Sequence, residues 1–291
     1  MTLGPAGTIS STLQGPEGSL EFLTTGSGSP ATVFAHGLVG SIPTTRPFGS
    51  GVRGSRTFMH FRGYGASEAG RAPWTYAGLA EDLRAVCDHV GATQALGVSM
   101  GAGALCSLLA ATPLRFVRLV FVMPAVLDQP RTDNGLSRLV AMARCVENGD
   151  IETLTYLLLQ AEPAFVKTQP GAELSCRRQS AAMVGTPVSQ ALRALPTAVP
   201  LTERGVLAEV TAPALVIAQG DDPEHPVLVA EQLAAALPDA RLEVVAPGGL
   251  MWRHRAVMRD LIGGFLSGDQ VGSAPERVSP VGVGQTEPRN T

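Results

Sequence analysis

Short apolar segments alternate with amphipathic segments along most of the chain, from residue 19 onward. Seven of the apolar segments are short enough for strands, and several are continuous apolar runs, as in strands that are buried on both faces. The alternation predicts an α/β protein with a mostly parallel sheet and helices on both faces. The seven predicted strands are 19–25, 31–37, 56–61, 94–99, 118–125, 214–220 and 241–247.

The segment 76–92 has the spacing of a helix that covers such a sheet. Its apolar residues recur every three or four positions, so they form one stripe, and Gly91 is placed to end the helix. The residues of the stripe are Leu79, Leu83, Val86 and Val90.

The region 128–208 interrupts the alternation. It contains three predicted helices, 134–150, 151–163 and 186–195, with no strand between them. We interpret it as a helical cap over the strand ends, inserted into a core formed by 1–127 and 209–266. The tail 267–291 is rich in Gly, Pro, Ser and charged residues, which predicts disorder, so we exclude it from the fold.

Composition narrows the possible partners and location. The chain has 291 residues, 45% of them hydrophobic, and a net charge of −3. Without a basic run, nucleic acid and anionic membranes are not expected partners. The four cysteines form no metal-binding or C-x-x-C pattern, so we expect free, buried thiols and no metal. We find no signal peptide and no apolar stretch of roughly 18 residues, which favours the cytoplasm.

The pentapeptide G-V-S-M-G places Ser99 between a predicted strand, 94–98, and a predicted helix, 100–111. This is the arrangement of a nucleophile elbow, in which the strand and helix approach too closely for side chains at Gly97 and Gly101. The alternative is a tight strand-to-helix turn with an inert serine. Two further stretches favour the nucleophile.

FAHGLVG, residues 34–40, follows a strand where a backbone N–H could hold an oxyanion. The predicted oxyanion hole consists of the N–H groups of Leu38 and Met100. HFRGYGASE, residues 60–68, follows the next strand as a Gly-rich turn. With these three motifs in this order, the chain resembles the α/β-hydrolase family over residues 12–266. The resemblance implies an eight-stranded sheet, a Ser–acid–His triad and no cofactor.

The resemblance places the acid after the strand 214–220. AQGDDPEHP is similar to the family's G-x-x-D-P segment, shortened by one residue, and Asp222 before Pro223 matches best. Asp221 would take its place if the alignment slipped by one residue. Asp128, after the strand 118–125, is a third candidate, because some family members place the acid there.

The base departs from the family pattern, which has Gly-His directly after the last strand. Here Gly249 and Leu250 occupy those positions, and only His225 and His254 follow Asp222. His254 lies in the expected connection, so we predict that it reaches both Ser99 and Asp222 as the base. His225 is on the same loop as the acid, and we assign it to the pocket. The alternative for His254 is a surface histidine at a helix N-terminus.

The remaining histidines receive structural roles. His36 shapes the oxyanion loop, His60 is structural, and His89 belongs to a helix that covers the sheet. The predicted substrate pocket comprises His36, Gly37, His225 and Trp252.

The leading hypothesis is a serine hydrolase that cleaves a small or medium apolar ester, lactone or thioester. The absence of a histidine after the last strand leaves open a non-hydrolytic lyase, cyclase or isomerase of a biosynthetic pathway. A ligand-binding pseudoenzyme is the third possibility. We expect a small apolar substrate as the partner, and the sequence gives no oligomeric state.

Overall fold

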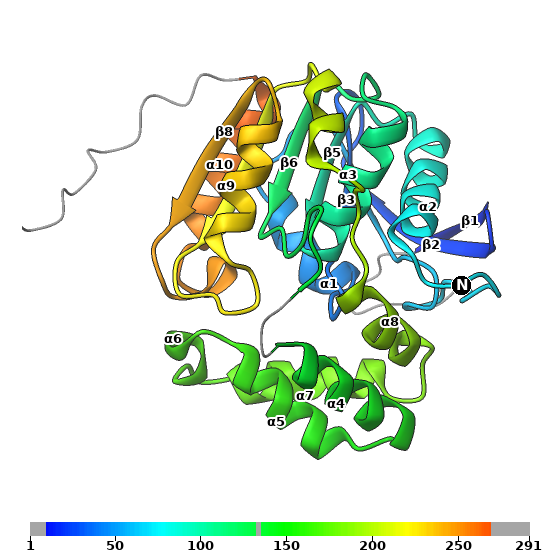
Figure 1. Cartoon of the computed structure of the whole chain (residues 1–291), viewed down its shortest axis with the longest axis vertical. Helices are drawn as coiled ribbons and strands as arrows, with labels where there is room; N and C mark the ends of the chain where they lie inside the picture. Colours follow the sequence, from blue (N-terminus) through cyan, green and yellow to red (C-terminus); the bar gives the residue numbers. More distant parts are fainter. Residues whose placement is uncertain (1–9, 132–134, 269–291) are drawn as a thin grey trace, which may run out of the picture.

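The computed structural model describes residues 10–131 and 135–268, which contain one eight-stranded sheet with helices on both faces (Figure 1). The strand order is β1-β2-β4-β3-β5-β6-β7-β8. The strands are β1 (Ser11–Gly15), β2 (Gly18–Thr25), β3 (Ala31–Ala35), β4 (Ser55–Met59), β5 (Gln94–Val98), β6 (Arg118–Val122), β7 (Ala214–Gln219) and β8 (Ala240–Val245).

Five of the seven strand pairings are parallel; only β1 with β2 and β2 with β4 are antiparallel. This confirms the predicted mostly parallel sheet. All seven predicted strands are present. β1 was not among them, because an edge strand with largely exposed residues has no apolar run to reveal it.

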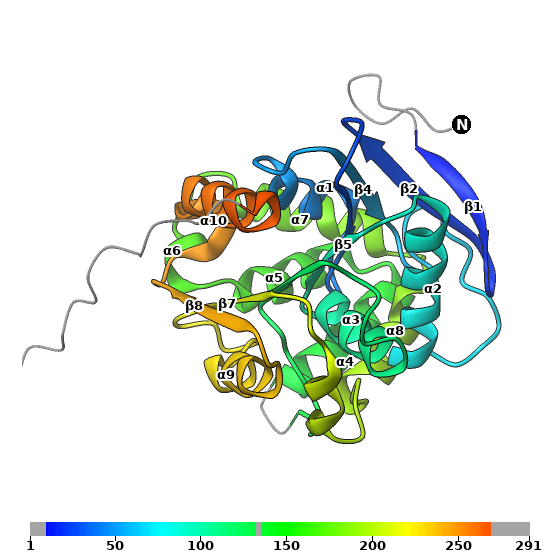
Figure 2. The same ribbon diagram turned by 90° about the horizontal axis from the view of Figure 1, so that it is seen from above.

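Helices cover both faces of the sheet, as Figure 2 shows. On one face lie α2 (Tyr76–His89), α3 (Met100–Ala111) and α9 (Val227–Ala236); on the other lie α1 (Ile42–Thr45) and α10 (Arg255–Ser267). Each face has its own apolar core. The four cysteines are free and buried, as predicted. No helix in the described part of the chain is both long and apolar enough to span a membrane.

Five helices follow β6 and lie together at one end of the sheet (Figure 1). They are α4 (Gly135–Asn148), α5 (Ile151–Ala161), α6 (Ala164–Lys167), α7 (Ala172–Met183) and α8 (Val188–Ala194). We call them the cap helices. The prediction missed α7, whose polar sequence AELSCRRQSAAM has only a weak apolar stripe. The exact boundaries of cap and core stay predictions, and the predicted disorder of 269–291 lies outside the described residues.

Irregular turns complete the chain. Three are 3₁₀ helices: Arg46–Gly49, Leu195–Thr197 and Arg204–Glu209. The connection between β8 and α10 contains a π-helical turn, Gly249–Arg253, which matters for the site described below.

The elbow depends on the absence of a side chain at Gly101. A Cβ there would lie 2.5 Å from the carbonyl oxygen of Ala35 in β3, far inside van der Waals contact. The carbonyl oxygen of His36 would also lie 2.9 Å from this Cβ. These neighbouring atoms belong to the backbone, so they cannot rotate away as a side chain could. A glycine at position 101 is therefore required for α3 to begin so close to the sheet.

We expect Gly101→Ala to lower the free energy of unfolding by about 3 kcal/mol or more, because the new methyl group must displace backbone in the core. Gly205→Ala is the matched control, since nothing lies within 4 Å of a Cβ at that position. Urea denaturation of both variants checks this, and equal stabilities would contradict the packing argument.

Candidate active site

Ser99 lies between β5 and α3 with φ 51° and ψ −107°, a backbone conformation that side chains rarely adopt. Its N–H donates to the carbonyl of Val122 at 2.9 Å, which fixes the turn to β6. This strained conformation turns the hydroxyl out of the helix, where it makes no capping hydrogen bond. The predicted elbow geometry is therefore present.

The Ser99 hydroxyl is hydrogen-bonded to His225. Nε2 of His225 lies 2.9 Å from Ser99 Oγ, and Nδ1 lies 2.9 Å from Oδ2 of Asp222. Because a carboxylate only accepts, Nδ1 carries the proton and Nε2 is free to accept the serine proton. The three side chains thus form one continuous Ser–His–Asp chain.

The acid and the histidine both lie on the short connection 220–226 between β7 and α9, which we call the triad loop. Asp222 uses both carboxylate oxygens there: Oδ2 accepts from His225, and Oδ1 accepts the N–H of Glu224 at 2.9 Å. Burial alone raises the pKa of Asp222, but its hydrogen bond to His225 and the charge of that imidazole outweigh burial and hold the pKa below its ordinary value.

The prediction that His254 reaches Ser99 is wrong. The π-helical turn after β8 buries Leu250 and carries the chain on to α10, where His254 stands at the N-terminus of the helix. There the Nε2 of His254 lies 3.2 Å from the carbonyl oxygen of Pro247, and the carbonyl of His254 accepts the N–H of Met258. It is the surface histidine of the alternative. His225, which we had assigned to the pocket, takes the position beside the serine.

The structure separates the three candidate acids. Asp222 bonds to the histidine, whereas its neighbour Asp221 has φ 62° and forms the bend of the loop. Asp128 pairs instead with Arg204, whose Nε lies 2.8 Å from Oδ2. Only Asp222 therefore has the geometry of the predicted acid.

The two predicted oxyanion donors remain available. Among the described residues, neither the N–H of Leu38 nor that of Met100 has an acceptor. The peptide after Leu38 is held by Tyr64, which donates its hydroxyl proton to the Leu38 carbonyl at 2.6 Å. Gly37 passes directly against the serine; a Cβ there would lie 3.3 Å from Ser99 Cβ. Both N–H groups are free to bind an anion.

His36 cannot line the substrate pocket as predicted, because it is fully buried. Its Nδ1 donates to the carbonyl of Gly37 at 2.8 Å, and its Nε2 accepts the N–H of Phe61 at 3.2 Å. These bonds require the neutral ring, and burial, aided by the charge of His60, lowers the pKa of His36 to about 3. His36 braces the oxyanion loop instead.

His60 has the structural role that was predicted. Its Nδ1 lies 2.8 Å from Oε2 of Glu21, and its Nε2 accepts the N–H of Ile42 at 2.9 Å. The hydrogen bond to His60 is the main reason that the pKa of Glu21 falls to about 2. This pair anchors the start of α1 behind the oxyanion loop. His89 is exposed on α2, with its ring against Phe22.

The cap helices reach both sides of the site. Gln179 of α7 donates to the carbonyl of Val39 on the oxyanion loop. Glu162, at the end of α5, lies within electrostatic range of the triad loop: burial and the charge of Asp222 raise its pKa, while Lys167 and His225 lower it. Its carboxylate has no hydrogen-bond partner among the described residues.

Trp252 is 40% exposed and lies against Gly249, which also faces Val166 of α6. Its contact with substrate stays a prediction. Within the described ranges, no group of three His, Cys, Asp or Glu side chains is arranged to hold a metal ion.

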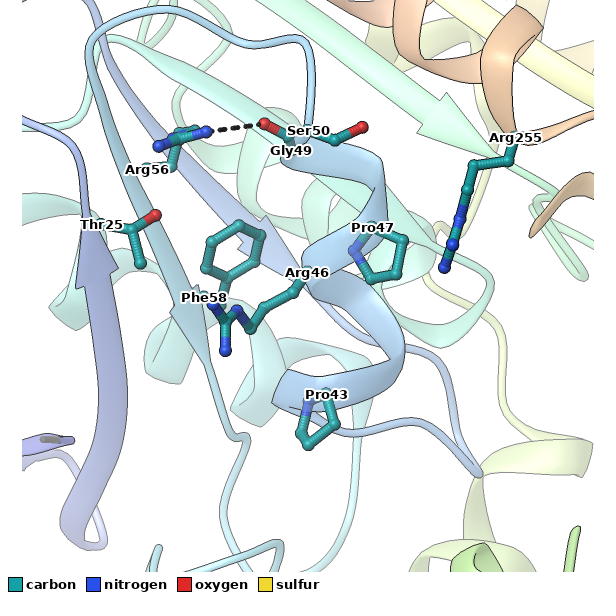
Figure 3. A pocket seen from close by; sticks show the side chains of 9 residues that line it. All are labelled: Thr25, Pro43, Arg46, Pro47, Gly49, Ser50, Arg56, Phe58 and Arg255. Atoms are coloured by element: carbon teal, nitrogen blue, oxygen red, sulfur yellow. Dashed lines mark hydrogen bonds between the residues drawn. The ribbon is translucent and has the colours of Figure 1, made fainter. Parts of the chain in front are cut away.

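A surface pocket of about 550 Å³ lies elsewhere (Figure 3). No triad residue lines it, and in Figure 3 the side chains of Arg46 and Arg255 lie on opposite sides of Pro47 rather than converging. The third arginine, Arg56, donates to the carbonyl of Gly49 at 3.2 Å. We assign no function to this pocket. It is lined by Thr25, Pro43, Arg46, Pro47, Gly49, Ser50, Arg56, Phe58 and Arg255.

The fold and the site together define a hydrolase-type α/β protein, with a serine at an elbow, a histidine and an acid. A model of the alpha/beta hydrolase fold matches residues 30–251, most of the chain, and the chain therefore belongs to the α/β-hydrolase fold family. A search of curated proteins finds no match.

Solved structures with esterase names have the same fold. An esterase from Exiguobacterium antarcticum is 18% identical, with a TM-score of 0.73, over 89% of this chain and 100% of the other. Carboxylesterase CesB from Bacillus subtilis is 17% identical, with a TM-score of 0.74, over 91% and 93%. A thermophilic esterase from Thermogutta terrifontis is 18% identical, with a TM-score of 0.71, over 87% and 96%. At these identities the likeness establishes the fold alone.

Because His36 is neutral in the folded protein, acid should destabilise the fold. Its pKa is about 3 when folded and 6.5 in the unfolded chain, so the unfolded state binds the extra proton between those values. We expect the free energy of unfolding to fall by up to about 1.4 kcal/mol per pH unit as the pH drops from 6.5 toward 5. Carboxylates contribute little to this pH dependence, because their ordinary pKa values lie below the interval.

His36→Gln keeps a donor and an acceptor but cannot titrate, so its unfolding free energy should depend less on pH over that interval. His89→Gln is the control at an exposed histidine. Urea denaturation at pH 6.5 and pH 5.0 measures the difference, and an unchanged pH dependence in His36→Gln would assign the acid sensitivity to other groups.

Proposed function

We propose that this protein is a serine hydrolase that cleaves a small or medium apolar ester, lactone or thioester through an acyl-enzyme. The observation that carries the proposal is the chain of two 2.9 Å hydrogen bonds, from Ser99 to His225 and from His225 to Asp222. This geometry is the one that activates a serine hydroxyl in acyl transfer.

In the first half-reaction, Ser99 Oγ attacks the substrate carbonyl carbon while Nε2 of His225 takes the hydroxyl proton. Asp222 stabilises the imidazolium that forms, and the N–H groups of Leu38 and Met100 bind the oxyanion of the tetrahedral intermediate. When that intermediate collapses, the bond to the leaving group breaks, and His225 returns its proton to the departing oxygen or sulfur. The acyl group remains on Ser99.

In the second half-reaction, water takes the place of the leaving group. His225 removes a proton from the water as it attacks the acyl carbonyl, and a second tetrahedral intermediate forms in the same oxyanion hole. Its collapse breaks the bond to Ser99 Oγ, which recovers the proton from His225. The products are the free acid and the regenerated serine.

Two kinds of observation bear on the substrate class: the names of structural neighbours and the burial of apolar residues in the cap. Three of the structural neighbours are named as esterases, which favours an oxygen ester. Four apolar residues of the cap helices, Leu139, Met142, Leu154 and Met183, are buried and pack the cap, while Tyr156 is exposed. Most of that apolar surface therefore serves packing, and the apolar character of the substrate stays a proposal, as does a cytoplasmic location.

A non-hydrolytic role was motivated by the missing histidine after the last strand. His225 supplies an imidazole from another connection, so that motive no longer applies. A pseudoenzyme would retain the fold without turnover, and the serine-directed test below separates it from the hydrolase.

We expect His225→Ala to lower kcat for short p-nitrophenyl esters on the order of 10⁴- to 10⁶-fold, as Ser99→Ala does, because both remove the activated nucleophile. His254→Ala should keep kcat within a few-fold of the wild type, since its imidazole is hydrogen-bonded to Pro247 at the surface. Steady-state kinetics and labelling by a fluorophosphonate provide the measurements. An active, labelled His225→Ala protein would refute the proposed base.

Asp222→Asn should lose most activity while the protein stays folded, because an amide cannot stabilise the imidazolium. A loss of about 10⁴-fold in kcat is the expected scale. Asp221→Asn should matter much less, since its side chain has no bond to the histidine and Asn tolerates the positive φ. Kinetics with the same esters compare the two; a larger loss at Asp221 would reverse their roles.

A further inference from the structure

The acid and the base of this site are neighbours on one short loop. Asp222 and His225 are three residues apart, and each is hydrogen-bonded to the other. The loop therefore moves them together, and only the distance from His225 to Ser99 depends on where the loop lies. What fixes the loop relative to the core determines whether the serine is activated.

Glu224 ties this loop to the cap. Its carboxylate accepts from Arg131 at 3.0 Å and from Arg138 of α4 at 2.5 Å, and Arg131 also donates to its backbone carbonyl at 3.0 Å. The backbone N–H of Glu224 donates to Oδ1 of Asp222 at 2.9 Å. Glu224 thus connects two cap-side guanidinium groups to the residue next to the catalytic histidine.

The ion pairs are shielded from solvent. The side chains are 8% exposed for Arg131, 14% for Glu224 and 24% for Arg138. Pairs with so little exposure are less screened than surface ion pairs, and their geometry is correspondingly better defined. Two other ion pairs of the cap helices, Arg177 with Glu152 and Arg193 with Glu147, are more exposed.

The loop also needs such a constraint. Asp221 has φ 62°, a conformation that costs a non-glycine residue free energy and persists when its surroundings enforce it. At the β7 end, the N–H of Gly220 is bonded to the carbonyl of Val245 at 2.9 Å. Beyond Asp221, the contacts of Glu224 with Arg131 and Arg138 reach from the loop to the cap side.

We propose that Glu224 is a positioning residue: through Arg131 and Arg138 it makes the cap hold His225 at hydrogen-bond distance from Ser99. The inference rests on the proposed hydrolase function and adds a cap-dependent step to it. Glu224 touches neither substrate nor the reacting atoms. It acts by holding the loop that carries both triad partners of the serine.

The test is Glu224→Gln, which preserves size and removes the charge. We expect kcat for p-nitrophenyl acetate to fall about 10- to 100-fold with KM nearly unchanged, because an ångström-scale shift of the base costs roughly that much in rate. The rate of fluorophosphonate labelling of Ser99 should fall in parallel. Wild-type kcat and labelling in Glu224→Gln would overturn the proposal.

Arg138→Gln tests the same contact from the cap side, and it keeps the test open if Glu224→Gln fails to fold. The double variant should be little worse than Glu224→Gln alone, since Arg138 acts through its ion pair with Glu224. The matched control is Glu147→Gln, which breaks the exposed pair with Arg193 between α4 and α8 and should leave kcat unchanged. Equal losses in Glu147→Gln and Arg138→Gln would indicate a general effect on the cap and refute positioning.

A crystal structure of Glu224→Gln, or of Arg138→Gln, separates this inference from the proposed function. We expect the distance from His225 Nε2 to Ser99 Oγ to exceed 3.5 Å while the bond from His225 to Asp222 persists. That result would support positioning even if the wild-type protein hydrolysed no ester. A retained 2.9 Å contact between His225 and Ser99 would refute it, whatever the activity.

Discussion

The hydrogen bond between His225 and Ser99 is the interaction on which the site depends. It joins a turn after β5 to a loop after β7, and β6 lies between these strands in the sheet. Its length is therefore set by the parallel register of three neighbouring strands and by the path of the loop after β7. A serine held with φ 51° cannot adjust its own backbone to compensate. The position of the triad loop therefore determines whether His225 lies at hydrogen-bond distance from Ser99.

The fold could be predicted from the sequence because its signals are local. Buried parallel strands are apolar runs, and the elbow glycines mark the close approach of α3 to β3. Two of the elements that escaped prediction, β1 and α7, lack those signals: the first is an exposed edge strand and the second has a largely polar sequence. Their positions are set by the partners they pack against, which the local pattern does not contain.

The serine and the acid were predictable for the same reason, whereas the base was not. Family resemblance directed attention to the connection after β8, and His254 lies there. The paths of two loops determine which histidine lies beside Ser99. The π-helical turn leaves His254 at the N-terminus of α10, and the bend at Asp221 brings His225 back to Asp222. The available signal was the spacing D-x-x-H itself, which allows a carboxylate to bond an imidazole within one turn.

Placing acid and base on one loop changes what the rest of the protein must do. In an arrangement with the histidine on a separate connection, two distances must be maintained by two loops. Here the bond from His225 to Asp222 is local, so displacement of the loop leaves it intact and affects only the approach to Ser99. The connection after β8 supplies no triad histidine, and it buries Leu250 in the apolar core on the α10 face of the sheet. Another part of the protein must then fix the distance from His225 to Ser99. The cap side contacts the triad loop through the ion pairs of Glu224 with Arg131 and Arg138. In this chain, the helices that cover the site also help to define it.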